Sequence, residues 1–132
     1  KEMAFIGKPF DPKNETFEAS FGTSRARFDY YARKRLENAH LQNTAPTYGW
    51  VKEAVGVTKV LLDKELDRQI ETPLLLCQAS RDTVVCLPEQ NRFVSLLPHA
   101  QLRAFDAKHE IYMSEDAVMR EYVPAVIEFL RG

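Results

Sequence analysis

Residues 73–82, Pro-Leu-Leu-Leu-Cys-Gln-Ala-Ser-Arg-Asp, combine a proline, a short apolar run and a closing acid. The run from Leu74 to Ala79 shows no alternation of apolar and polar residues. A run of this length and kind predicts a strand that is buried on both faces, as in a parallel sheet. The closing acid, Asp82, then falls in the loop after the carboxyl end of that strand.

A helix and a second strand follow along the chain. Pro88 fits the first turn of a helix over residues 89–97, which stops before Pro98. Residues 101–105 alternate in part and predict another strand. The strand–helix–strand order implies a parallel crossover, which is right-handed almost without exception. The fold class is therefore α/β.

The last helical region begins near Ser114, where Glu115 and Asp116 put two acids at the positive end of the helix dipole. Pro124 inside this region implies a kink or a restart of the helix. The apolar face of the region is expected to comprise Val126, Ile127, Phe129 and Leu130.

Two helices are predicted ahead of the first strand. One covers residues 24–39, with Ser24 as its N-cap, and its apolar stripe is Phe28, Tyr31, Ala32, Leu36 and Ala39. The other begins after Thr47, and its stripe is Trp50, Ala54, Val57 and Leu61. A charged run then leads from residue 62 to a turn that ends at Thr72.

The remaining upstream features are an arm and a basic cluster. Residues 7–23 have neither helical nor strand periodicity, which predicts an irregular arm pinned to apolar surface by Phe10, Phe17 and Phe21. The cluster at residues 33–35, Arg-Lys-Arg, fits a phosphate or lipid-headgroup contact or a solvated helix face. The solvated face is favoured because acids interleave with the bases.

Composition restricts the class of protein. The chain has 132 residues, which fits one domain, and a formal charge of −1, which gives no field to attract nucleic acid. No apolar run approaches the roughly 20 residues that cross a membrane. The first residues do not have the pattern of a signal peptide, so we expect a cytoplasmic location, with peripheral association with the membrane left open. Cys77 and Cys86 are expected to be free, buried thiols.

The loops after the two predicted strands carry the candidate chemistry. Because the carboxyl ends of adjacent parallel strands meet at one sheet edge, Asp82 and His109 should lie side by side. An acid that orients a histidine makes up two thirds of a nucleophilic triad. On spacing alone, a turn or capping role for the acid and a structural or exposed role for the histidine remain the commoner alternatives.

Residues 78–85 (QASRDTVV) and 107–111 (AKHEI) resemble the acid and histidine loops of the α/β-hydrolase superfamily, in its lysophospholipase and monoacylglycerol-lipase branch. Residues 23–31 (TSRARFDYY) and 46–51 (PTYGWV) resemble, more loosely, the helical cap of bacterial lysophospholipases of that branch. The resemblance implies an irregular arm and helical cap over residues 1–72 and the C-terminal part of the hydrolase core over residues 73–132.

The resemblance also implies roles for individual residues. Asp82 is similar to the triad acid and His109 to the general base. The cap aromatics implied to cover an acyl-binding cleft are Tyr48, Trp50, Phe28 and Tyr31, although each of them fits plain cap-to-body packing as well. The implied substrate is a lysophospholipid, a monoacylglycerol or a similar acyl ester, and no cofactor is implied.

The family's nucleophile does not occur in this chain. It stands in a Gly-x-Ser-x-Gly elbow between a strand and a helix, and none of the five serines has glycines at that spacing. We therefore expect the C-terminal part of a serine ester hydrolase, inactive alone and requiring an N-terminal half or self-association to cover the apolar strand. The alternative is a truncated, non-catalytic module that acts through dimerisation or partner binding.

A metal site is not predicted. His109 has no second histidine at helical spacing, and Cys77 and Cys86 are too far apart in sequence to form a zinc knuckle.

Overall fold

The computed structural model describes residues 9–43, 45–61 and 70–132. The first two residues of the predicted arm and the charged run from residue 62 lie outside the described residues. The elements in chain order are η1 (Pro12–Asn14), α1 (Arg25–Glu37), η2 (Ala39–Leu41), α2 (Tyr48–Leu61), β1 (Leu74–Ala79), α4 (Leu87–Leu96), β2 (Ala100–Phe105), η3 (Ile111–Met113) and α5 (Asp116–Arg131).

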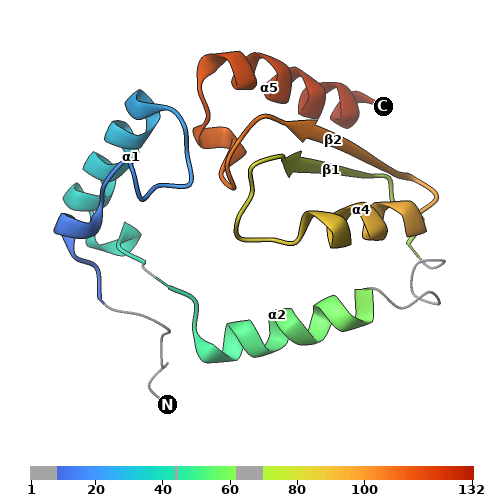
Figure 1. Cartoon of the computed structure of the whole chain (residues 1–132), viewed down its shortest axis with the longest axis horizontal. Helices are drawn as coiled ribbons and strands as arrows, with labels where there is room; N and C mark the ends of the chain where they lie inside the picture. Colours follow the sequence, from blue (N-terminus) through green and yellow to red (C-terminus); the bar gives the residue numbers. More distant parts are fainter. Residues whose placement is uncertain (1–8, 44, 62–69) are drawn as a thin grey trace.

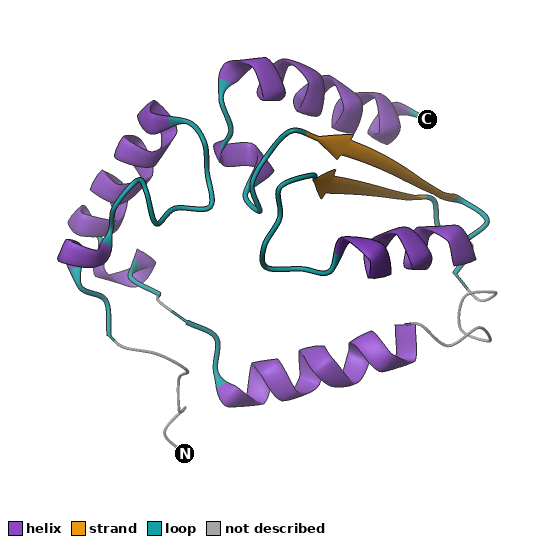
Figure 2. Ribbon diagram, viewed as in Figure 1, coloured by secondary structure: helices purple, strands orange, loops and turns teal. Residues whose placement is uncertain are grey.

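Strands β1 and β2 pair in parallel, in a register that runs from Leu74 opposite Ala100 to Ala79 opposite Phe105. Helix α4 connects them, so the predicted strand–helix–strand unit is confirmed. The strands lie between α4 on one side and α5 on the other (Figures 1 and 2). This arrangement is compatible with an α/β fold.

The buried core lies between the sheet and α5. It comprises Ala79, Phe105, Ala107, Ile111 and Ala125, with Cys77, Val118 and Tyr122 packed against it. The rings of Phe105 and Tyr122 meet edge to face, with centroids 5.4 Å apart. Two of its members, Ala107 and Ile111, belong to the segment after β2, so the core also anchors that segment.

The predicted apolar face of α5 is wrong in part. Ile127 and Leu130 are exposed. The residues that face the core, Val118, Tyr122 and Ala125, follow helical spacing in a different register. The sequence predicted a kink or a restart at Pro124, and of these two the restart does not occur, because the helix runs through Pro124 as one element.

Strand β1 is less buried than predicted. Its first four residues, Leu74 to Cys77, are only half-buried, while Gln78 and Ala79 are buried. Within the described residues the sheet has two strands, so β1 has a ladder partner along one edge. Gln78 is accommodated because its amide nitrogen donates to Gln90 Oε1 at 2.9 Å and Asn91 Oδ1 at 3.0 Å on α4.

Helix α1 begins as predicted and packs differently. Ser24 is the N-cap, and its hydroxyl accepts a hydrogen bond from Arg27 N at 3.4 Å. Of the predicted stripe, Phe28 is buried, whereas Leu36 and Tyr31 are exposed. The basic cluster is not wholly solvated either, because the Arg35 side chain is only 8% exposed.

Arg35 is buried because every side of its guanidinium finds a partner. It forms an ion pair with Glu15 at 2.6 Å and donates to the carbonyl oxygens of Leu41 at 3.1 Å and Asn43 at 2.6 Å. The Phe10 ring covers it at 4.8 Å. This anchor fastens the predicted arm and the segment after α1 to the helix.

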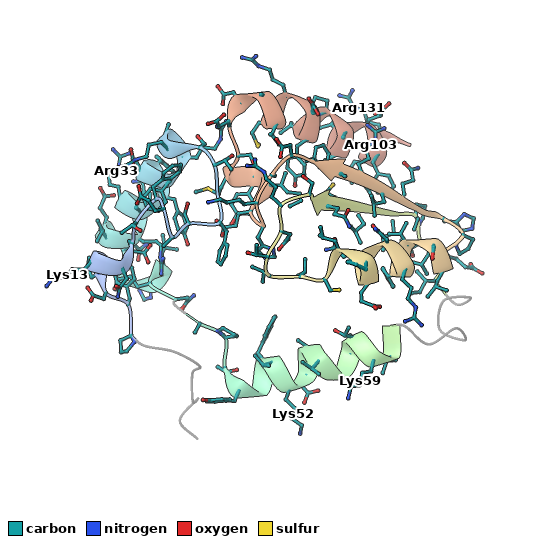
Figure 3. The ribbon with its side chains drawn as sticks, in the orientation of Figure 1. Lys13, Arg33, Lys52, Lys59, Arg103 and Arg131 are labelled. Carbon is teal, nitrogen blue, oxygen red and sulfur yellow. The ribbon has the colours of Figure 1, made fainter. Side chains whose placement is uncertain are left out.

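Helix α2 begins after Thr47, whose hydroxyl accepts a hydrogen bond from Trp50 N at 3.1 Å, as the cap prediction requires. Most of its large apolar side chains are exposed, namely Tyr48, Trp50, Val55, Val57 and Val60, with Trp50 at 63%. Lys52 and Lys59 point away from the sheet (Figure 3). In the described residues, no helix is long and apolar enough to cross a membrane.

Candidate functional site

Asp82 lies in the tight turn that ends β1. Its backbone N–H donates to Ala79 O at 3.1 Å. One carboxylate oxygen, Oδ1, accepts hydrogen bonds from Val84 N at 2.7 Å and Val85 N at 3.2 Å. The acid therefore caps its own loop, which fixes the carboxylate and leaves its second oxygen available to a neighbouring loop.

His109 lies in the loop after β2. The two loops are joined through their backbones, because Ser80 N donates to Phe105 O at 2.9 Å and Arg81 N donates to Ala107 O at 3.0 Å. His109 Nδ1 lies 2.8 Å from Asp82 Oδ2. The predicted contact between the two side chains is confirmed, and the parallel register of the strands produces it.

The carboxyl of Asp82 is charged at neutral pH. Burial works to raise its pKa, since the side chain is only 5% exposed, but hydrogen bonds from His109 and from the N–H groups of Val84 and Val85 outweigh burial and lower the pKa below its ordinary value. A carboxylate only accepts hydrogen bonds, so the proton of a neutral His109 ring is on Nδ1. Nε2 is then left with a lone pair that can take a proton.

The His109 ring has a second neighbour that sequence reasoning did not place at the site. The Phe21 ring meets it edge to face, with centroids 5.9 Å apart and an angle of 76° between the planes. The available signal was the set of aromatics in the irregular arm. It predicted an apolar attachment and carried no information on which loop the arm reaches.

Two of the four predicted cleft aromatics lie near this loop. Phe28 and Tyr31 on α1 line a cavity of about 310 Å³ together with Phe21, Glu110 and Met113. Phe28 also packs edge to face on Phe17, with centroids 5.7 Å apart. Tyr48 and Trp50 lie on α2, do not line this cavity and are exposed.

The five serines lie within the described residues, and none of their hydroxyls is a recorded hydrogen-bond partner of His109. Ser20 donates to Phe17 O at 2.8 Å, and Ser24 caps α1. The Ser114 hydroxyl is buried without a partner in the described part of the chain. The described site therefore contains a hydrogen-bonded acid and histidine alone.

The thiols and metal ligands do not add to the site. Cys77 is half-buried, and burial raises the pKa of its thiol despite the opposing charge of Arg103. Cys86 is exposed, which contradicts the prediction of a buried thiol, because it stands at the solvent-facing start of α4. Across the described ranges, no group of three or more His, Cys, Asp or Glu side chains could hold a metal ion.

Comparison with known proteins gives one distant similarity. The chain is 27% identical over 107 residues to a protein of Haemophilus influenzae named "Probable lysophospholipase L2", a match that covers 80% of this chain and 34% of that protein. The chain thus spans about a third of the length of this curated relative. No protein-family model and no solved structure matches the chain. The similarity indicates an α/β-hydrolase-like relationship at low identity.

Proposed function

We propose that this chain supplies the acid and the histidine of a serine ester hydrolase. The observation that carries the proposal is the 2.8 Å contact between His109 Nδ1 and Asp82 Oδ2 beyond the carboxyl ends of two parallel strands. An ionised acid that fixes the tautomer of a histidine and leaves Nε2 free is the arrangement that activates a hydroxyl nucleophile.

The chemistry assigned to the two residues follows from their hydrogen bond. His109 Nε2 takes the proton of a serine hydroxyl as the serine oxygen attacks the ester carbonyl, and later gives that proton to the leaving alcohol. Asp82 accepts the Nδ1 hydrogen bond throughout and stabilises the imidazolium that forms. Water then repeats the sequence on the acyl-enzyme and releases the fatty acid.

The proposed substrate is a lysophospholipid or a related acyl ester. Two observations support it: the name of the distant relative, and a cavity beside the histidine loop whose mixed lining combines the aromatics Phe28 and Tyr31 with polar and charged residues. A cavity of about 310 Å³ falls in the size range of small-molecule sites. In this proposal Tyr48 and Trp50 cover the acyl chain from α2, and the protein works in the cytoplasm, at the membrane surface where such lipids occur.

The nucleophile and the oxyanion hole must come from residues other than these 132, because no Gly-x-Ser-x-Gly elbow occurs among them. We assign the edge of β1 that has no strand partner among the described residues to a strand of the segment that carries them. Leu74, Leu75 and Leu76 are half-buried, and complete burial stabilises a leucine-sized side chain by about 1.5–3 kcal/mol. Pairing would also satisfy the backbone groups along that edge.

An esterase assay tests the proposal. The purified 15.2 kDa chain should not hydrolyse p-nitrophenyl butyrate above an inactive control, and a serine-directed fluorophosphonate should not label it. Extending the chain at its N-terminus with the encoded upstream segment should restore both reactions. Strong, fluorophosphonate-sensitive activity from the 132-residue chain alone would contradict the proposal, as would an extended protein that is folded and inert.

Size-exclusion chromatography with light scattering tests the assignment of the β1 edge. The 132-residue chain should self-associate, and the extended protein should elute as a monomer, because the added strand then occupies the edge. A monomeric 132-residue chain that binds little hydrophobic dye would show that β1 needs no further partner.

A further inference from the structure

The residues on both sides of His109 are held by one short segment, residues 20–24, which joins the arm to α1. Lys108, the residue before the histidine, donates its Nζ to Ser20 O at 3.2 Å. Glu110, the residue after it, donates its N–H to Phe21 O at 3.2 Å. The Phe21 ring packs on the imidazole itself. The segment therefore contacts His109 and both of its chain neighbours.

The same segment is tied to the end of the histidine loop. Thr23 N and Ser24 N both donate to Met113 O, at 3.1 Å and 3.0 Å. In return, Glu115 N donates to the Thr23 hydroxyl at 3.2 Å, just before α5 begins. We call residues 20–24 the strap. These bonds fix the loop from Lys108 to Glu115 against it.

Gly22 is the position where the strap and the loop come closest. A Cβ atom built there would lie 2.7 Å from Met113 Cβ and 2.9 Å from Met113 O. Neither atom is the far end of a flexible side chain, so any larger residue would push the strap and the loop apart. The positive backbone φ that commonly requires a glycine is not found at Gly22, so close approach is the reason for this one.

A hydrogen bond to Asp82 does not by itself fix the plane of the imidazole, because a carboxylate accepts over a broad range of directions. We propose that the strap is the positioning element for His109, with Phe21 fixing the ring and Gly22 permitting the close approach. The effect of the strap on catalysis rests on the proposed function, whereas its effect on the position of the His109 ring does not.

The test uses the uniformly ¹⁵N-labelled 132-residue chain and measures solvent exchange of the His109 Nδ1–H proton by NMR. Phe21→Leu should raise the exchange rate about two- to tenfold, the scale set by loss of one aromatic contact. Gly22→Ala should raise it by about tenfold or more, because the whole loop is displaced. The extended protein should then show a lower kcat with little change in KM.

Two control variants accompany these substitutions. Gly56→Ala adds the same methyl group on α2, where a Cβ would meet nothing within 4 Å, and Tyr30→Leu shortens an exposed aromatic on α1. Both should leave the His109 proton unchanged. The side-chain amide of Gln78, held by α4, reports whether the fold is intact in every variant.

Wild-type exchange of the His109 proton in Phe21→Leu, with an intact Gln78 signal, would overturn the inference. If Gly22→Ala fails to fold, Phe21→Leu decides alone, since it leaves the strap backbone unchanged. The readout needs no catalysis, so an inert extended protein would overturn the proposed function while a shifted exchange rate still supports the strap.

Discussion

Helices α1 and α2 have similar lengths and the same kind of start, yet they relate differently to the rest of the chain. Each begins after a hydroxyl residue, Ser24 or Thr47, that caps its first turn. Helix α1 is fixed at its start by the strap and along its length by Phe28 and Arg35. Helix α2 exposes the large apolar side chains Tyr48, Trp50, Val55, Val57 and Val60.

The difference shows what determines a helix and what determines its attachment. Capping and apolar spacing are local, and they correctly predicted that both segments are helical. The attachment of α1 depends on residues that precede it, since the strap at residues 20–24 reaches the histidine loop about ninety positions further along the chain. Helical spacing contains no information on such a contact.

The largest expected effect is on activity, which should fall far more when the acid beside His109 is changed than when a residue of α2 is changed. In the extended protein, Asp82→Asn should lower kcat by about 10⁴-fold, because the tautomer of His109 is no longer fixed. Trp50→Ala should change kcat/KM by about tenfold at most, the scale of one lost apolar contact. Steady-state kinetics on an acyl ester measures both. Comparable losses in the two variants would mean that α2 takes part in catalysis.

The second prediction separates α1 from α2 by stability. Phe28 is 7% exposed, so Phe28→Ala should lower the free energy of unfolding by about 3–5 kcal/mol, with a cavity added beside Phe17. Val57→Ala on the exposed face of α2 should change it by about 0.5 kcal/mol or less. Urea denaturation followed by circular dichroism tests the pair. A large loss in Val57→Ala would show that α2 is covered in solution.

Much of the site was predictable because parallel strands obey simple rules. The apolar run at β1, the helix bounded by Pro88 and Pro98, and the second strand fix a crossover, and the crossover brings Asp82 and His109 together. The capping alternative for the acid was also correct, since one oxygen of Asp82 caps its loop while the other meets the histidine. The catalytic roles of the pair stay a prediction.

The rest could not be predicted because it depends on contacts distant in sequence. Arg35 was assigned to solvent because acids interleave with the basic cluster, whereas the arm acid Glu15 and the chain after α1 explain its burial. The core-facing side of α5 is set by Val118, Tyr122 and Ala125, whose mixed character weakens the periodic signal. Phe21 was expected to pin the arm to apolar surface, but it is 46% exposed and its ring meets the imidazole of His109, a contact that the sequence does not indicate.

The third prediction concerns stability at acid pH. It compares two side-chain contacts, Asp82 with His109 and Asp116 with Arg27. The pKa of Asp82 lies below its ordinary value of 3.8 in the folded chain. A carboxyl with a lowered pKa adds stability at pH values above its unfolded pKa, and that stability is lost as the pH falls through the folded pKa. Asp82→Asn should therefore flatten the fall in unfolding free energy below about pH 4.

Asp116 supplies the matched control for that measurement. Its hydrogen bond and ion pair with Arg27 of α1, 2.7 Å long, lower its pKa also, but the carboxyl is exposed. Asp116→Asn should flatten the acid limb less than Asp82→Asn, because solvent and salt screen an exposed pair. If Asp116→Asn had the larger effect, the contact most sensitive to acid would be the one between α1 and α5 and not the one between the two strand loops.

The smallest expected effect again distinguishes α1 from α2, through the titration of one tyrosine. Burial, the charge and hydrogen bond of Glu110, and the neighbouring Tyr31 raise the pKa of Tyr112 to about 12. A group whose folded pKa is raised contributes stability below its unfolded pKa of 10.0, and loses it as the pH rises toward 12. Glu110→Gln should move the Tyr112 titration back toward its ordinary range.

Tyr31→Phe should shift the same titration downward by a smaller amount, since Tyr31 acts only through its charge when ionised. Tyr48→Phe on α2 should leave it unchanged. Ultraviolet difference spectra in alkaline solution, compared with Tyr112→Phe to identify the signal, measure each shift. Equal effects of Tyr31→Phe and Tyr48→Phe would contradict the distinction, because Tyr31 of α1 influences Tyr112 and no residue of α2 is among the described groups that do.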